Sequence, residues 1–267
     1  MPLAHALVTA PDTKPEKWML FLHGILGSGA NWRTFAKQIV AARPEWGAAL
    51  VDLRLHGDSL HMKPPHTVAA CAHDVAELAA ELPGPVRAVL GHSFGGKVAI
   101  AYAATHDLDR LFVVDSTPGA RPDARGSEST KHIIDLLMTL PHELPDRKAF
   151  DAFLEERGVS RPIIMWLAMN VRPVPNTTRY TFRIDMSGIR ALLVDYLGLD
   201  LWSVLEHPAP GRETVLVVGG KSDVVDAADR ARAAACPHTT LEVLPEAGHW
   251  VHVDAPDALR AIVLGKL

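Results

Sequence analysis

Residues 86–105 constrain the fold of this chain more than any other segment. The pentapeptide Gly91-His92-Ser93-Phe94-Gly95 lies between a short apolar run and a helix-like run. This context predicts a strand that turns sharply into a helix, with the serine hydroxyl exposed on a strained corner. Glycines on both sides omit the Cβ atoms that would block so tight a turn. The free N–H groups at the start of the helix would point toward whatever approaches the serine.

Short apolar runs alternate with helix-like segments along most of the chain. This alternation predicts an α/β fold, with a mostly parallel central sheet of about seven strands and helices on both faces. An edge strand, for which an antiparallel orientation is one option, is expected within residues 3–9. The remaining strands are predicted at residues 18–22, 48–53, 86–90, 111–115, 215–218 and 241–244, and the helices at about 32–40, 67–82, 94–106, 225–236 and after Pro256.

The alternation breaks between residues 117 and 210. This stretch has mostly helical patterns, is interrupted by several prolines and contains no clear strand. We therefore expect a helical cap inserted after the strand that ends at Asp115. The predicted division is a core of residues 1–116 and 211–267 and a cap of residues 117–210. Near the carboxyl ends of the strands, such a cap could roof a crevice, where open α/β sheets bind ligands.

Composition excludes several classes of protein. With 267 residues and 48% hydrophobic content, the chain can form one substantial core. The formal net charge of -4 gives no basic excess for nucleic acid. No apolar run is long enough to span a membrane, and the first residues lack the pattern of a signal peptide, so a cytoplasmic location is expected. Two cysteines, Cys71 and Cys236, are expected as buried free thiols. The oligomeric state is not indicated.

No cofactor or metal is expected. The Gly95-Gly96-Lys97 stretch lacks the spacing of a phosphate-binding loop. His56, His61 and His66 recur every five residues, but Pro64-Pro65 prevents one regular element from presenting them to a metal ion.

A nucleophilic serine needs a base to accept its proton, and usually a carboxylate to orient that base. Position must select among 14 histidines. His249 directly follows the last predicted strand, in a loop that opens on the same sheet edge as Ser93. Asp115 and Asp223 each follow a predicted strand and are both candidates for the carboxylate.

The chain resembles the α/β-hydrolase superfamily over nearly its full length. Within it, the stretch of residues 23–28 and the D-x-R-x-H-G-x-S run at residues 52–59 are similar to small cap-bearing serine esterases, both bacterial and mitochondrial. The matching pieces occur in the family's order, and they are His23-Gly24, Asp52 to Ser59, Gly91 to Gly96, Val114-Asp115, Gly219 to Asp223 and Gly248-His249-Trp250.

The resemblance implies that Ser93 is the nucleophile and His249 the general base and then acid. It also implies an oxyanion hole made by the backbone N–H groups of Ile25 and Phe94. Both Asp115 and Asp223 stand at positions that carry the acid in this superfamily. The esterase branch favours Asp115, with a serine near the later position, as at Ser222; one residue of alignment slip would exchange Ser222 and Asp223.

The expected function is a serine hydrolase that cleaves a carboxylic ester or a thioester of a small molecule. The substrate pocket is expected to include His23, His92, Trp166, Phe182, Trp202 and Trp250, with Met169 as a further candidate. The alternative for Trp166, Phe182, Trp202 and Met169, which all lie in the insertion, is that they only hold the cap to the body. Two alternatives remain open. The same residues could perform carbon–carbon hydrolysis or acyl transfer, or the chain could be a binding protein that kept the fold without turnover.

Overall fold

The computed structural model describes residues 2–267 and contains a seven-stranded sheet, as the alternation predicts. The strand order is β1-β3-β2-β4-β5-β8-β9. Strand β1 pairs antiparallel with β3, and every other pairing in the sheet is parallel. The strands are β1 (His5–Val8), β2 (Lys17–Leu22), β3 (Trp46–Val51), β4 (Val86–His92), β5 (Arg110–Val114), β8 (Glu213–Gly219) and β9 (Thr239–Leu244).

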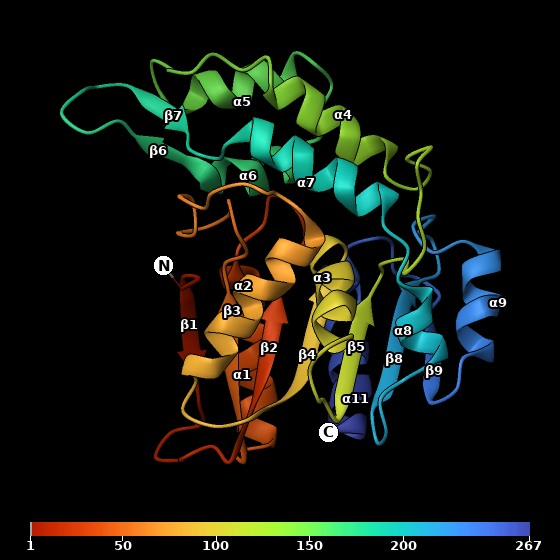
Figure 1. The fold of residues 1–267 in the computed structure, drawn as a ribbon. Coiled ribbons are helices and arrows are strands. Elements are labelled where there is room, and N and C mark those ends of the chain that lie inside the picture. Colours follow the sequence, from red (N-terminus) through yellow and green to blue (C-terminus); the bar gives the residue numbers. More distant parts are fainter. Residues whose placement is uncertain (1) are drawn as a thin grey trace.

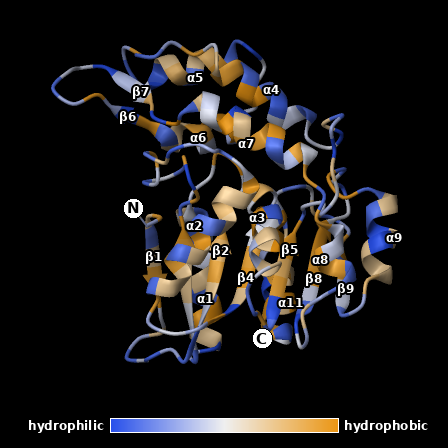
Figure 2. Cartoon of the chain, viewed as in Figure 1, coloured by the Kyte–Doolittle hydropathy of each residue, from blue (hydrophilic) through white to orange (hydrophobic). Residues whose placement is uncertain are grey.

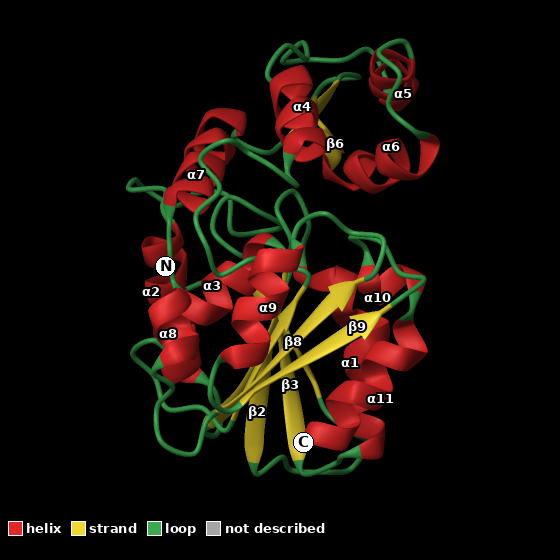
Figure 3. Cartoon of the chain, turned by 90° about the vertical axis from the view of Figure 1, so that its right-hand side faces the viewer, coloured by secondary structure: helices red, strands yellow, loops and turns green. Residues whose placement is uncertain are grey.

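Helices cover both faces of this sheet (Figures 1 and 3). On one face lie α2 (Val68–Glu81), α3 (Phe94–Ala103), α8 (Trp202–Glu206) and α9 (Ala227–Ala235). On the other lie α1 (Arg33–Ala42), α10 (Val251–Asp254) and α11 (Pro256–Lys266), with the turn η1 (Gly29–Trp32) leading into α1.

Two hydrophobic layers follow from the period-two alternation of the strands, whose apolar character is visible in Figure 2. In β2, Leu20 and Leu22 point into the layer beneath α2 and α3. Met19 and Phe21 point into the opposite layer, beneath α1 and α11. All four side chains are buried, so the sheet is apolar on both sides, as parallel sheets require.

The segment between β5 and β8 forms a largely separate layer over the carboxyl ends of the strands (Figures 1 and 3). It contains a short antiparallel hairpin, whereas the sequence shows no clear strand there. Both strands have three residues and β6 ends at Pro173, so neither shows a recognisable alternation and only the pairing reveals them. The elements are α4 (Glu128–Leu137), α5 (Arg147–Glu155), α6 (Arg161–Leu167), η2 (Ala168–Asn170), β6 (Val171–Pro173), β7 (Tyr180–Phe182) and α7 (Met186–Gly198).

Helix α8 belongs to the same stretch of sequence but contacts α3 beside the sheet rather than joining this upper layer. Both cysteines are free and buried, as expected. Among residues 2–267, none of the helices combines the length and apolar character needed to cross a bilayer.

Candidate active site

Ser93 occupies a sharp corner between β4 and α3. Its backbone angles are φ 54° and ψ -120°, a conformation that costs energy in a residue with a side chain. The neighbouring glycines are required by close packing of the main chain. A Cβ on Gly91 would lie 2.1 Å from the carbonyl oxygen of Gly95, and one on Gly95 would lie 2.5 Å from that of His23. The corner therefore needs both glycines, and it leaves the serine side chain lining a cavity.

A chain of hydrogen bonds leads from Ser93 to a buried carboxylate. Nε2 of His249 lies 3.1 Å from Oγ of Ser93, and Nδ1 lies 2.7 Å from Oδ2 of Asp115. A carboxylate can only accept, so Nδ1 carries the proton and Nε2 is free to accept from the serine hydroxyl. The sequence-selected histidine and serine, 156 residues apart, are thus brought within hydrogen-bond distance.

Asp115 is fully buried, and three donors compensate its charge. Besides the His249 ring, Oδ1 accepts the backbone N–H of Gly219 at 3.0 Å. Oδ2 also accepts the hydroxyl of Ser222 at 2.5 Å. The carboxylate is therefore held in one orientation, with its second oxygen aimed at the imidazole.

Asp223 does not reach His249 in the structure. It is exposed and lines the cavity, and no hydrogen bond joins it to the ring among the described residues. Ser222, the preceding residue, is the one that points at Asp115. The geometry therefore brings Asp115, and not Asp223, to the histidine that faces Ser93.

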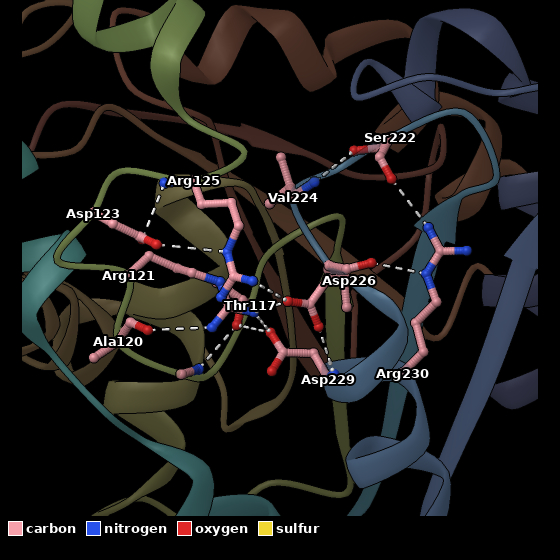
Figure 4. A network of polar contacts seen from close by, with 12 residues as sticks. Thr117, Ala120, Arg121, Asp123, Arg125, Ser222, Val224, Asp226, Asp229 and Arg230 are labelled. Carbon is pink, nitrogen blue, oxygen red and sulfur yellow. Dashed lines mark hydrogen bonds and ion pairs between the residues drawn. The ribbon is translucent and has the colours of Figure 1, made fainter.

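A network of charged side chains holds the Asp115 side of the site (Figure 4). Arg121 pairs with Asp226 at 3.1 Å and with Asp229, and Thr117 also donates to Asp229. Arg230 donates to the carbonyls of Gly219 at 3.0 Å and Ser222 at 3.1 Å. These contacts tie the chain just after Asp115 to helix α9, and they fix the loop that carries Ser222.

Ile25 and Phe94, whose backbone N–H groups are expected to form an oxyanion hole, are neighbours of Ser93. Both residues line a small space that also includes Ser93 and His249. Neither N–H donates to another group within residues 2–267. Two unpaired donors next to a nucleophilic oxygen are the arrangement that stabilises a developing oxyanion.

Two buried histidines hold the loop that carries Ile25, a role that the sequence did not indicate for either residue. Nε2 of His56 accepts from the N–H of Leu26 at 2.9 Å, and its Nδ1 donates to the carbonyl of Arg54 at 2.9 Å. Nε2 of His23 accepts from the N–H of Leu53 at 3.0 Å. Each loop thus supplies a ring that accepts from the other loop's backbone. The only sequence signal is the paired occurrence of His23 and His56 after neighbouring strands.

Burial keeps these rings neutral. It lowers the pKa of His23 to about 4. It also lowers the pKa of His56 to about 3, and the nearby His23 ring adds to that effect. Neutral rings can accept from a backbone N–H, which protonated rings cannot do, so the two loops depend on this protonation state.

The turn at residues 52–58 is held by side-chain hydrogen bonds. The two carboxylate oxygens of Asp52 accept from the N–H groups of Gly29 at 2.8 Å and Asp58 at 2.9 Å. Gly57 has φ 54°, and a Cβ there would lie 2.1 Å from the carboxylate of Asp52. Through the hydrogen bond from Gly29, this turn holds the loop after β2 in place.

The cavity beside Ser93 has a volume of about 390 Å³. His23, His92, Trp166 and Trp250 line it, and the two tryptophan rings meet edge to face with their centres 4.8 Å apart. The inserted segment adds apolar side chains that the sequence did not indicate, among them Ile133 and Ile163. The lining is therefore shared by the sheet loops and the upper layer.

The structure corrects two of the expected pocket residues, Phe182 and Trp202, and does not place Met169 there either. Phe182 stacks on Phe150 within the inserted segment, with ring centres 5.5 Å apart. Trp202 is buried beneath Gly119, where α8 packs on the body. Met169 lines a different cavity. Apolar character alone does not show which surface an aromatic residue covers, and here both aromatic residues serve internal packing.

The two histidines nearest to His249, His92 and His252, are uncharged. His92 donates from Nε2 to the carbonyl of His249 at 2.8 Å, which anchors the loop that presents the ring. Burial holds the pKa of His92 well below its ordinary value, and burial lowers the pKa of His252 to about 4. Neutral neighbours do not repel a positive charge that forms on the His249 ring.

No group of three or more histidine, cysteine, aspartate or glutamate side chains within residues 2–267 is arranged to hold a metal ion. The arrangement around Ser93 instead combines a hydroxyl, a base and a carboxylate. With two unpaired N–H donors, it can carry out nucleophilic acyl chemistry.

Comparisons with known proteins agree with this geometry. The model of a family described as "Alpha/beta hydrolase family" matches residues 19–262. The protein named "sn-1-specific diacylglycerol lipase ABHD11" of Mus musculus is 31% identical over 96% of this chain and 82% of its own length. The protein named "2-succinyl-6-hydroxy-2,4-cyclohexadiene-1-carboxylate synthase" of Serratia proteamaculans is 25% identical over 91% of this chain and 90% of its own length. Among solved structures, "Marine microorganism esterase" superposes with a TM-score of 0.85 at 23% identity, covering 100% of this chain and 99% of that chain.

Proposed function

This chain belongs to the alpha/beta hydrolase family, and on that premise we propose that it is a serine hydrolase that cleaves carboxylic esters through an acyl-enzyme on Ser93. The observation that carries this proposal is the hydrogen-bonded chain from Ser93 through His249 to Asp115, which opens into a cavity. The 31% identical relative is named as a diacylglycerol lipase, which supports ester cleavage as the kind of reaction.

In the proposed acylation step, the Ser93 oxygen attacks the ester carbonyl carbon while Nε2 of His249 accepts the hydroxyl proton. The carbonyl oxygen takes up the negative charge between the N–H groups of Ile25 and Phe94. Asp115 stabilises the imidazolium, which then gives its proton to the departing alkoxide. The products of this step are an alcohol and an acyl-Ser93 ester.

Deacylation repeats the sequence with water. His249 accepts a proton from water as its oxygen attacks the acyl carbon, and it then returns a proton to the Ser93 oxygen. The carboxylic acid leaves and the enzyme regains its starting protonation. Thioesters would follow the same path, with a thiolate as the leaving group.

We also propose that the upper layer from α4 to α7, residues 128–198, acts as a cap that shapes the acyl-binding side of the cavity. Ile133 in α4 and Ile163 and Trp166 in α6 supply apolar lining above Ser93. A lining of this kind favours uncharged acyl groups, because burial of apolar surface contributes about 25 cal/mol per Å².

A serine-directed fluorophosphonate probe tests the assignment, together with hydrolysis of short-chain p-nitrophenyl esters. We expect the native protein to be labelled at Ser93 and active, and Ser93→Ala to lose both properties. Ser129 also lines the cavity, so Ser129→Ala is a matched control that should retain both. Full activity in Ser93→Ala would refute the role of this serine, and a folded native protein that resists the probe would favour a binding protein.

A further inference from the structure

A second cavity of about 700 Å³ lies apart from the Ser93 cavity, between the β1 edge of the sheet and the inserted segment. It shares only Leu26 and Gly27 with the lining of the Ser93 cavity. Four arginines from different elements line it: Arg33 at the start of α1, Arg147 at the start of α5, Arg172 in β6 and Arg183 just after β7. We call this cavity the arginine groove.

The positive charge of the arginine groove is only partly neutralised. Asp58 is paired with Arg183 at 3.0 Å. Asp52, the other carboxylate in the lining, accepts two backbone N–H groups and pairs with no arginine. Arg33, Arg147 and Arg172 form no ion pair with any residue in the described part of the chain. Three unpaired guanidinium groups therefore face one concave surface, although the whole chain has a net charge of -4.

Main-chain contacts already position two of these guanidinium groups. Arg147 donates from Nη2 to the carbonyl of Ala168 at 2.7 Å. Arg172 donates from Nη1 to the carbonyls of Met169 and Val171. Each guanidinium has five N–H donors in a planar fork, so most of them stay available. Groups held in this way lose less rotamer entropy when they bind a ligand.

Arg183 supplies a fourth guanidinium, on a side chain that is 23% exposed. Its Nε is buried and has no hydrogen-bond partner within residues 2–267, which is costly for a charged group. Its Nη1 donates to Oδ1 of Asp58, which lies in the turn of residues 52–58. A ligand with several acceptor oxygens could bridge the arginines of the upper layer and Arg33 of the body, because guanidinium matches phosphate oxygens in bidentate geometry.

We propose that the arginine groove binds a phosphate-bearing group, such as a diphosphate, at a site separate from Ser93. The proposal does not depend on hydrolase activity. The phosphate could belong to a soluble ligand or to a lipid headgroup, since both present the same oxygens. In either case, a bound anion would link the inserted segment to the loop of residues 26–30.

Isothermal titration with pyrophosphate tests the proposal at low ionic strength. The native chain should bind it saturably, and Arg147→Gln/Arg172→Gln should weaken binding at least about tenfold, because it removes two charge-assisted contacts. The matched control Arg157→Gln/Arg161→Gln removes two charges from the same segment outside the groove and should leave affinity unchanged. Asp58→Asn releases Arg183 and should tighten binding about threefold, a gain that misfolding cannot produce.

Flotation with phosphatidylglycerol vesicles, compared with phosphatidylcholine vesicles, distinguishes a soluble phosphate ligand from a lipid headgroup. Pyrophosphate binding that depends on Arg147 and Arg172 assigns a soluble phosphate. Flotation that depends on them, without pyrophosphate binding, assigns a lipid headgroup. The proposal is overturned if neither ligand binds, or if both double variants behave alike. Ester hydrolysis by each variant reports the integrity of the fold and of the Ser93 site independently.

Discussion

His56 offers a test of how the structure holds the oxyanion donor at Ile25. The side chain is fully buried and makes two hydrogen bonds of 2.9 Å, one from the N–H of Leu26 and one to the carbonyl of Arg54. In His56→Leu, both backbone groups would lose their partner in a buried place. Each unsatisfied group costs about 1 to 3 kcal/mol, so the free energy of unfolding should fall by about 2 to 6 kcal/mol.

The same substitution should lower kcat more than it changes KM. Without His56, the N–H of Leu26 turns toward another acceptor. The N–H of the adjacent Ile25 then no longer points at the position of the oxyanion. Loss of one oxyanion donor costs about 10²- to 10³-fold in kcat, which is the upper bound for this indirect effect. His56→Gln places an amide oxygen near the position of Nε2, so it should recover most of kcat while stability stays reduced.

Urea unfolding and steady-state hydrolysis of p-nitrophenyl acetate measure the two effects separately. His73→Leu, at an exposed position in α2, is the matched control and should change neither quantity. The reasoning fails if His56→Leu retains native kcat, or if the leucine and glutamine variants have the same kcat despite their different hydrogen-bonding capacity.

Four further predictions follow from the buried polar contacts. Asp115→Asn should lower kcat for ester hydrolysis about 10³- to 10⁴-fold, because an amide in place of the carboxylate no longer stabilises the imidazolium. In the same assay, the kcat of Asp223→Asn should stay within about twofold of the native value. The reverse order of effects would assign the acid to Asp223. Ser222→Ala removes one of the three donors to the buried Asp115 and should lower the free energy of unfolding by about 1 to 3 kcal/mol in urea; an unchanged midpoint would contradict this contact. Burial lowers the pKa of His23 from 6.5 to about 4, so its contribution to stability is present above pH 6.5 and falls by about 3 kcal/mol as the pH decreases to 4. Urea midpoints should show this loss in the native chain, and less of it in His23→Gln; equal losses would exclude His23 as the source. Lys97→Met should destabilise the fold by about 2 to 4 kcal/mol in urea, because the buried ammonium donates to three main-chain carbonyls; an unchanged midpoint would show that they find other partners.

Much of the fold can be predicted from the sequence because it depends on local patterns of residues. Apolar runs of strand length, separated by amphipathic helices, predict the seven-stranded sheet and its helical layers. The G-x-S-x-G corner predicts the turn at Ser93 for a steric reason that the structure displays, since no Cβ fits at Gly91 or Gly95. The antiparallel hairpin at β6 and β7 escapes prediction because three-residue strands show no periodicity.

Some residues of the site can likewise be predicted from the sequence, whereas others are identified only by the three-dimensional structure. Ser93 and His249 each follow a strand of one parallel sheet, so the sequence can predict that they share its carboxyl edge. The partner of His249 cannot be read in this manner, because a slip of one residue exchanges Ser222 and Asp223. Only the three-dimensional path of the loop brings Asp115 to Nδ1 and turns Ser222 toward the same carboxylate.

By itself, the sequence determined the succession of strands and helices that form the sheet and its two helical layers, together with the serine corner. These features depend on backbone sterics and on burial periodicity, which act over a few residues. Tertiary structure alone decided which distant side chains meet. It made Lys97 a buried donor to main-chain carbonyls at both ends of the inserted segment, and it gathered arginines from separate elements around one groove. Contacts of this kind depend on how whole layers pack, and no local pattern of residues encodes that.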